Sequence, residues 1–320
     1  MAKITVGVLR GGPSSEYEIS LKTGENVLRH LPQEKYKTLD IFISRQGEWH
    51  HTGIARPPET ILRTVDVVFN AMHGEYGEDG TVQKILERYD IPFTGSGAIT
   101  SRFAIKKDIT KNVLARNGLT VLPSIVVRPD DDIQTTLTLV HKKMAPPWVV
   151  KPTGKGSSVG ISIVRTLPDV EKAILDVFRI DSSALVEKYI KGREATCGVL
   201  ENFRNEKQYA LPVIEIISPK GKFFDYQSKY DGSTQEICPG RFTTREKTHM
   251  QDAAIRAHKT LGCRHYSRTD MILANDTVWV LETNTLPGLT SESLLPKSAE
   301  AIGLSFPGLL DHVVTLALNK

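Results

Sequence analysis

The chain has 320 residues, which is long enough for two or three domains with well-filled cores. Its hydrophobic fraction of 40% and its charged fraction of 24% are those of an ordinary globular protein. The formal net charge of +4 comes from basic residues scattered along the chain. This pattern argues against a nucleic-acid partner and fits a protein with anionic substrates.

The sequence predicts no export or membrane attachment. Charged and polar residues interrupt the N-terminus from Arg10 onward, and no apolar run approaches the length of a membrane span. The three cysteines, Cys197, Cys238 and Cys263, form no C-x-x-C pair and are odd in number. We therefore expect a reduced, cytoplasmic protein.

The first third of the chain alternates apolar runs with amphipathic segments, which predicts an α/β domain. We expect strands at 4–9, 36–43 and 65–70. We also expect one helix that ends near Leu28 and two more at 81–89 and 101–117. In a doubly wound parallel sheet, ligands bind at the loops that follow the strands.

The rest of the chain predicts shorter strands joined by turns, with fewer helices. The expected strands are 121–128, 148–152, 161–164, 184–190, 193–200 and 211–217, and the expected helices are 132–143, 246–261 and 305–316. A long polar loop at 219–234 contains Tyr226, Lys229 and Tyr230. A loop of this length in an enzyme is usually a lid or a substrate loop.

Two loops in the first domain carry polar residues after strands. The turn GGPSSEYEIS from residue 11 places Glu16 and Glu18 at a helix start, where they either anchor a substrate or simply cap the helix. The second loop begins HGEYGEDG at His73. Its H-x-E resembles zinc deaminases, but their P-C-x-x-C partner is absent, so we reject that reading.

A glycine-rich loop, TGKGSSVG from residue 153, has three possible meanings. It contains a literal G-x-S-x-G around Ser158, yet a nucleophile elbow requires a helix next, and residues 161–164 indicate a strand. The chain has no Walker A sequence. The remaining readings are a flap whose backbone N–H groups cover phosphates, with Lys151 behind it, and a plain glycine hairpin.

The apolar run 278–281 ends in Glu282 and Asn284, whose i, i+2 spacing places both side chains on one face of a strand. Asp270, twelve residues upstream of Glu282, occupies a similar place in the segment YSRTDMIL from residue 266. If the two strands are neighbours, three oxygen ligands meet at one point, which suits Mg²⁺. The alternative is that these residues end their strands facing water.

Seven motifs together resemble the D-alanine–D-alanine ligases of the ATP-grasp superfamily over essentially the whole chain. They are GGPSSEYEIS from 11, HGEYGEDG from 73, KPTGKGSSVG from 151, GRE from 192, FDYQSKY from 224, RTD from 268 and ETNTLPGLT from 282. Each motif alone is weak, but seven in this order are specific.

The resemblance implies an α/β fold of three domains: a doubly wound N-terminal domain at 1–100, a central ATP-grasp subdomain at 101–187 and a metal-binding domain at 188–320. ATP lies between the antiparallel sheets of the last two. The implied ATP-binding residues are Lys107, Lys151, Glu187, Lys188, Ile190 and Glu194. Lys106 precedes Lys107 where relatives commonly have an acidic residue, so either lysine could contact phosphate.

The resemblance also implies the remaining site residues and the reaction. The catalytic residues would be Glu16, Ser157, Tyr230, Arg268 and Gly288, the substrate-binding residues His73, Lys229, Ser293 and Leu294, and the ligands of two Mg²⁺ or Mn²⁺ ions Asp270, Glu282 and Asn284. The implied reaction joins two D-alanines at the expense of ATP, through an acyl phosphate, for peptidoglycan synthesis. The family further suggests a homodimer.

Other functions are weighed against this one. Another carboxylate–amine ligase or a D-alanyl–D-lactate ligase could use the same scaffold, although relatives that make the ester tend to lack the tyrosine at position 230. A nucleotide-binding regulator without turnover would be expected to lack some metal or oxyanion residues, and all are present here. A serine hydrolase at Ser158 is disfavoured by the strand that follows it.

Overall fold

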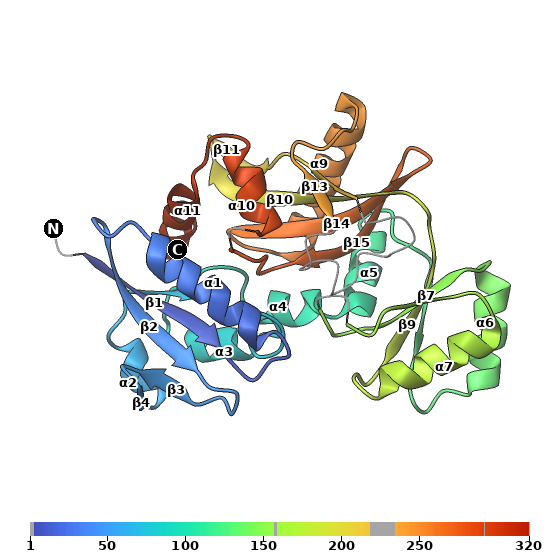
Figure 1. The fold of residues 1–320 in the computed structure, drawn as a ribbon, viewed down its shortest axis with the longest axis horizontal. Helices are drawn as coiled ribbons and strands as arrows, with labels where there is room; N and C mark the ends of the chain where they lie inside the picture. The colour runs from blue at the N-terminus through green and yellow to red at the C-terminus, as the bar shows by residue number, and fades with distance from the viewer. Residues whose placement is uncertain (1–2, 157–158, 218–233, 291, 320) are drawn as a thin grey trace.

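The computed structural model describes residues 3–156, 159–217, 234–290 and 292–319. Three β-sheets follow one another along the chain, each with helices packed against it (Figure 1). The N-terminal sheet, shown in blue, and the small central sheet, shown in green, lie on either side of the large C-terminal sheet. Among the described residues, no helix is long and apolar enough to cross a membrane.

The N-terminal sheet is parallel at its centre, as predicted, with two antiparallel strands added at one edge. Its order is β4-β3-β2-β1-β5, and β1 pairs in parallel with both β2 and β5. The elements are β1 Ile4–Gly11, α1 Tyr17–His30, β2 Tyr36–Ile43, β3 Trp49–His51, β4 Ile54–Ala55, α2 Pro58–Leu62, β5 Val67–Asn70 and α3 Thr81–Arg88. The loops after β1 and β5 therefore open at the same edge of the sheet.

The central sheet is antiparallel, with the order β6-β9-β7-β8. Its elements are β6 Ser124–Val127, α6 Ile133–Lys143, β7 Trp148–Pro152, β8 Ser162–Val164, α7 Leu167–Phe178 and β9 Ala184–Lys188. Side chains from both helices and three of the strands form one apolar core that includes Val140, Trp148 and Ile174. The opposite face of the sheet is left to line a cavity.

The C-terminal sheet is also antiparallel, with the order β13-β12-β10-β14-β15 and with β11 paired to β10. Its elements are β10 Arg193–Phe203, β11 Glu206–Ala210, β12 Ile214–Ile217, β13 Gln235–Ile237, α9 Thr244–Leu261, β14 Tyr266–Ala274, β15 Thr277–Asn284, α10 Leu294–Glu300 and α11 Phe306–Leu318. α9 begins at a capping box of Thr243 and Glu246, and it ends at Gly262, whose φ of 68° is available to glycine without strain.

The prediction of a single helix at 101–117 is wrong. The structure has two helices there, α4 Ala98–Ala104 and α5 Lys107–Arg116, with a break at Ile105 and Lys106. Lys106 has an extended backbone, and the N–H of Lys107 donates to the carbonyl of Thr153 in the glycine loop at 2.9 Å. A tertiary hydrogen bond thus takes the donor that a continuous helix would have used internally.

The first and last parts of the chain share one hydrophobic core. Val8 and Phe69 of the N-terminal sheet cluster with Leu286, Leu295 and Leu310 of the C-terminal region. In Figure 1, α10 and α11, drawn in red, accordingly lie beside the N-terminal domain. This shared core fixes the loops after β1 and β5 against the end of β15.

Candidate active site

Two cavities meet at the centre of the molecule. The sheet cavity, of about 190 Å³, lies between the central and C-terminal sheets, and the α1 cavity, of about 680 Å³, lies between α1 and the end of β15. Gly156 and Glu282 line both cavities. Groups bound in the two cavities would therefore meet at these residues.

The sheet cavity brings together all six of the predicted ATP-binding residues. Lys107, Lys151, Glu187, Lys188, Ile190 and Glu194 line it. They come from α5, β7, the end of β9 with the segment after it, and β10. Apolar side chains that include Leu122, Val149, Met271 and Leu281 line the same space. An apolar slot with charged groups at its edge suits a nucleotide, whose base is flat and whose phosphates are anionic.

Glu187 lies at the buried side of this cavity and is held by two lysines. One carboxylate oxygen forms an ion pair with Lys111 of α5, and the other lies 2.5 Å from Nζ of Lys151. Burial opposes ionisation of Glu187, but the two ammonium groups hold its pKa below the ordinary value. Glu187 is therefore a buried anion that can accept hydrogen bonds.

Lys107, rather than Lys106, points toward the junction of the cavities. Nζ of Lys107 lies 3.2 Å from Glu282 and donates to the backbone carbonyl of Lys155 at 2.6 Å. The ammonium group of Lys106 instead lies beside Gly154. Of the two lysines, Lys107 is the one that lines the sheet cavity.

Arg268, Asp270, Glu282 and Asn284 occupy one face of the paired strands β14 and β15. Arg268 lies opposite Asn284 and Asp270 opposite Glu282, and a bulge after Asp270 accommodates Leu281. Because side chains alternate along a strand, this register directs all four to the same face. The expected meeting of the three oxygen ligands on neighbouring strands is what the structure shows.

Asp270 is the centre of this group. Arg268 donates to both carboxylate oxygens at 2.9 Å, Thr196 donates to Oδ1 at 2.6 Å, and the Asn284 amide donates to Oδ2 at 3.1 Å. Burial opposes the charge of Arg268, but Asp270 and Glu282 raise its pKa. The guanidinium is thus charged and held in a fixed orientation.

The donor set fits a hard divalent cation. Asp270 and Glu282 supply carboxylate oxygens, Asn284 supplies an amide oxygen, and no thiolate or imidazole lies among these three. Both carboxylates already face cationic side chains, Arg268 and Lys107, which shows that positive charge is accommodated at this position. Among the described residues, no cluster of three or more His, Cys, Asp or Glu side chains could hold a metal.

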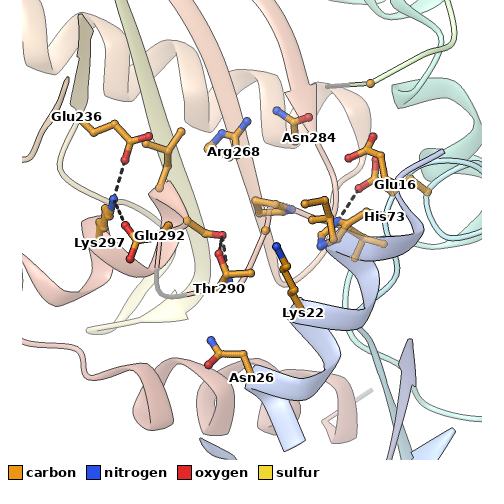
Figure 2. A pocket seen from close by; sticks show the side chains of 18 of the residues that line it. Glu16, Lys22, Asn26, His73, Glu236, Arg268, Asn284, Thr290, Glu292 and Lys297 are labelled. Carbon is orange, nitrogen blue, oxygen red and sulfur yellow. Dashed lines mark hydrogen bonds and ion pairs between the residues drawn. The ribbon is translucent and has the colours of Figure 1, made fainter. Parts of the chain in front are cut away.

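The α1 cavity brings together those predicted catalytic and substrate-binding residues that the structure describes. Glu16, His73, Arg268, Gly288, Ser293 and Leu294 line it. Figure 2 shows Glu16 and His73 on one side, Lys22 and Asn26 along α1, and Arg268 and Asn284 on the facing strands. On the far side, Lys297 forms ion pairs with Glu236 at 2.9 Å and Glu292 at 3.4 Å.

His73 is buried behind the α1 cavity with both ring nitrogens in contact with polar groups. Nε2 lies 2.8 Å from the hydroxyl of Thr23, and Nδ1 lies 3.3 Å from Glu78. Burial would lower the pKa of His73, but the hydrogen bond and charge of Glu78 raise it above its ordinary value. Burial likewise raises the pKa of Glu78.

The segment after β15 forms the wall opposite α1. The hydroxyl of Ser293 accepts from the N–H of Thr290 at 3.0 Å, and a Cβ on Gly288 would lie 2.8 Å from that hydroxyl oxygen. Only glycine fits this approach without displacing Ser293. Ser293 and Leu294 then begin α10.

Three predicted site residues lie outside the described residues. They are Ser157 of the glycine loop and Lys229 and Tyr230 of the 219–234 loop. The prediction that this loop acts as a lid also falls on residues that are not described, except for Thr234.

Sequence reasoning missed four charged residues of the site: Glu75, Glu78, Lys111 and Lys155. Lys111 follows Lys107 by one helical turn, a spacing that places both lysines on one face of α5, so a helix starting at Lys107 would have revealed it. The ion pair between Glu75 and Lys155 joins residues 80 positions apart. No local pattern indicates such a contact.

The fold and these two joined cavities define an ATP-grasp enzyme, in which two antiparallel sheets enclose a nucleotide. Residues 113–315 match the family model described as "D-ala D-ala ligase C-terminus", and residues 5–60 and 51–96 match "D-ala D-ala ligase N-terminus". The chain belongs to the D-alanine–D-alanine ligase family.

Individual relatives match over their whole length. The D-alanine–D-alanine ligase of Syntrophobacter fumaroxidans is 41% identical, with 99% of this chain and 98% of the relative covered. That of Clostridium beijerinckii is 39% identical, with 98% of each covered.

Solved structures also match over essentially their whole length. A VanG D-Ala:D-Ser ligase from Enterococcus faecalis has a TM-score of 0.86 at 31% identity, covering 99% of this chain and 100% of its own. The Bacillus anthracis D-alanine–D-alanine ligase complexed with ATP has a TM-score of 0.81 at 32% identity, covering 99% and 98%.

Proposed function

We propose that this protein joins two molecules of D-alanine to D-alanyl-D-alanine with the conversion of ATP to ADP and phosphate, as a step of peptidoglycan synthesis. The observation that carries the proposal is the junction of the two cavities at Gly156 and Glu282. A nucleotide in the sheet cavity would present its terminal phosphate where a carboxylate in the α1 cavity can reach it.

The first step transfers the γ-phosphoryl group to the carboxylate of the first D-alanine. A carboxylate is a poor acyl donor, and the acyl phosphate gives it a good leaving group. Lys107, which contacts Glu282 at the junction, and Lys151 line the sheet cavity and would neutralise phosphate charge there. Glu16, which approaches Gly156 from the α1 cavity, would hold the ammonium group of this substrate.

The second step forms the peptide bond. The amine of the second D-alanine attacks the carbonyl carbon, negative charge develops on the carbonyl oxygen, and phosphate leaves. Arg268 and the N–H of Gly288 line the cavity and would stabilise that charge, and such donors are worth roughly 3–4 kcal/mol each in comparable oxyanion sites. Ser293 and Leu294 would hold the second carboxylate together with Lys229.

We further propose that Asp270, Glu282 and Asn284 hold two Mg²⁺ or Mn²⁺ ions. Bound metal would neutralise the phosphate oxygens during transfer. The oxygen donors on one strand face and the neighbouring cationic contacts support this assignment. Arg268 would keep Asp270 oriented both with and without bound metal.

A second acceptor deserves a direct test, because one structural neighbour is a D-Ala:D-Ser ligase with a TM-score of 0.86. D-serine differs from D-alanine only by a hydroxyl group. D-lactate would require an alcohol, rather than an amine, to attack. We expect D-alanine to be preferred, with Tyr230 favouring an amine.

A cytoplasmic homodimer completes the proposal. The thiols of Cys197 and Cys263 are free and buried, and Cys238 is free and half-buried, which fits a reducing compartment. The dimer rests on the family alone, and the mass of the protein in solution tests it.

The function is tested by ADP release with D-alanine as both donor and acceptor, with dipeptide measured in parallel. We expect one dipeptide for each ADP, and no ADP above background with L-alanine. D-serine and D-lactate are then added beside D-alanine, and the mixed products are counted. ADP release that is independent of D-alanine would contradict the proposal.

A further inference from the structure

Glu75 lies in the loop between β5 and α3 and holds the turn that carries Glu16. Its Oε2 accepts from the hydroxyl of Ser14 at 3.2 Å, and from the backbone N–H and hydroxyl of Ser15 at 3.2 and 3.1 Å. These three donors fix the orientation of the carboxylate. Its other oxygen forms an ion pair with Lys155.

Lys155 belongs to the glycine loop. The described part of this loop also forms hydrogen bonds with residues outside the N-terminal domain. Its backbone carbonyl accepts from Lys107 at 2.6 Å, and the N–H of Gly154 donates to Asp181 at 2.7 Å. Lys107 in turn contacts Glu282. One continuous set of polar contacts therefore runs from Glu75 through the loop to the junction of the cavities.

At Gly156, the described part of the loop reaches Glu16, the residue proposed to hold the first substrate. A Cβ on Gly156 would lie 2.6 Å from Oε1 of Glu16, so the backbone there touches the carboxylate that would bind the substrate ammonium. A side chain at position 156 would therefore push the Glu16 carboxylate aside. The position of Gly156 and the orientation of Glu16 are thus coupled.

We propose that the ion pair between Glu75 and Lys155 is a positioning device that holds the glycine loop of the central domain against the N-terminal domain, and so protects the acyl phosphate from water. The inference rests on the proposed function. Glu75 and Lys155 are positioning residues, because they act through the loop and through Glu16 rather than on reacting atoms.

The cost of a loosened loop follows from the chemistry. If water enters, its oxygen attacks the carbonyl carbon of the acyl phosphate, the bond from carbon to the phosphate oxygen breaks, and D-alanine and phosphate are released with a proton. ATP is then consumed without dipeptide. The side chains of Glu75 and Lys155 are 30% and 28% exposed, so the pair is partly shielded from solvent.

The experiment compares phosphate release with dipeptide formation in Glu75→Gln, Lys155→Met, the double variant and Lys155→Arg. Glutamine keeps an acceptor for the serines but loses the charge. We expect each neutralising single variant to release about threefold more phosphate per dipeptide, and the double variant to be no worse than either, because the pair acts as a unit. Lys155→Arg, which keeps the charge, should restore a ratio near that of the unmodified enzyme.

The control is Lys35→Met, which removes another ion pair, to Asp311 at 2.7 Å, between the N-terminal domain and α11. It lies away from the residues that line either cavity and should leave the ratio unchanged. Unchanged ratios in Glu75→Gln and Lys155→Met, or effects that multiply in the double variant, would overturn the inference. Failure of the unmodified protein to form dipeptide at all would instead contradict the proposed function.

Discussion

Arg268 and Asn284 lie directly opposite each other on β14 and β15, and both donate to the carboxylate of Asp270. Arg268 would stabilise the carbonyl oxygen, and Asn284 would bind metal. The carboxylate of Asp270 therefore positions a residue for each of the two steps of the reaction. Any change to this group is expected to affect chemistry more than binding.

Replacing Arg268 with alanine should lower kcat by about 10²–10³-fold, because a charged donor at the developing oxyanion is lost. The KM for ATP should change little, since Arg268 lines the α1 cavity rather than the sheet cavity. Steady-state kinetics with D-alanine in excess measures both. Arg241→Ala, which removes an exposed partner of Glu215, is the control. An unchanged kcat in Arg268→Ala would show that the guanidinium does not act on the transition state.

Replacing Glu282 with glutamine should lower ADP formation by about 100-fold or more and raise the Mg²⁺ concentration needed for half-maximal activity. The fold should survive, because the amide has the same shape and Glu282 lies at the cavity junction rather than in a core. A Mg²⁺ titration of activity, with a thermal unfolding curve beside it, separates the two effects. Full activity at the usual Mg²⁺ concentration would refute the metal assignment. Glu206→Gln on exposed β11 is the matched control.

Lys111 is expected to act on ATP binding through Glu187. Lys111→Met should cost about 3 kcal/mol or more of stability, since it leaves Glu187 with one buried partner, and should raise the KM for ATP by about tenfold. The double variant Lys111→Met, Glu187→Met should regain neither stability nor ATP affinity, because it leaves the buried Lys151 without its carboxylate partner. Urea unfolding and ATP kinetics check the two parts. Recovery of ATP binding in the double variant would show that Glu187 does not recognise the nucleotide.

His265 should make the fold less stable in mild acid. Burial, together with nearby Arg264, lowers the pKa of His265 from 6.5 to about 4, although Glu201 opposes this shift. The unfolded chain therefore takes up a proton at a pH where the folded protein does not. The stabilisation is complete above about pH 6.5 and is lost as the pH falls toward 4, which amounts to roughly 2 kcal/mol between pH 7 and pH 5.

The variant His265→Asn tests this pH dependence, because asparagine tolerates the positive φ of 65° but does not titrate. Its urea unfolding free energy should fall less between pH 7 and pH 5 than that of the unmodified protein. The exposed His249→Asn should leave the pH dependence as it is. An identical pH dependence in His265→Asn would contradict the assignment of this effect to His265.

The pairing of β14 with β15 could be predicted because it depends on local patterns. β15 is an apolar run that ends in polar residues, whereas the polar residues of β14 precede its apolar run, and the alternation of side chains fixes which of them share a face. The register of Asp270 with Glu282 confirms that expectation. The placement of the six nucleotide residues in one cavity likewise agrees with the resemblance.

Other features depend on contacts that no local pattern contains. The break between α4 and α5 arises from a hydrogen bond of Lys107 to Thr153, which is distant in sequence. The sequence analysis also missed α7, although the signals for this helix are local. Thr166 caps its N-terminus, and a proline stands in its first turn. The domain boundaries at 100 and 187 stay predictions.

The central claim is that the terminal phosphate of ATP meets the carboxylate of D-alanine beside Glu282. It is tested most directly by following an oxygen atom from D-alanine into the released phosphate. D-alanine labelled with ¹⁸O at both carboxylate oxygens is converted with unlabelled ATP, and the released phosphate is examined by mass spectrometry. Reaction through an acyl phosphate predicts one labelled oxygen in each phosphate released per dipeptide, and one retained in the new peptide carbonyl. Dipeptide formation with unlabelled phosphate would contradict it.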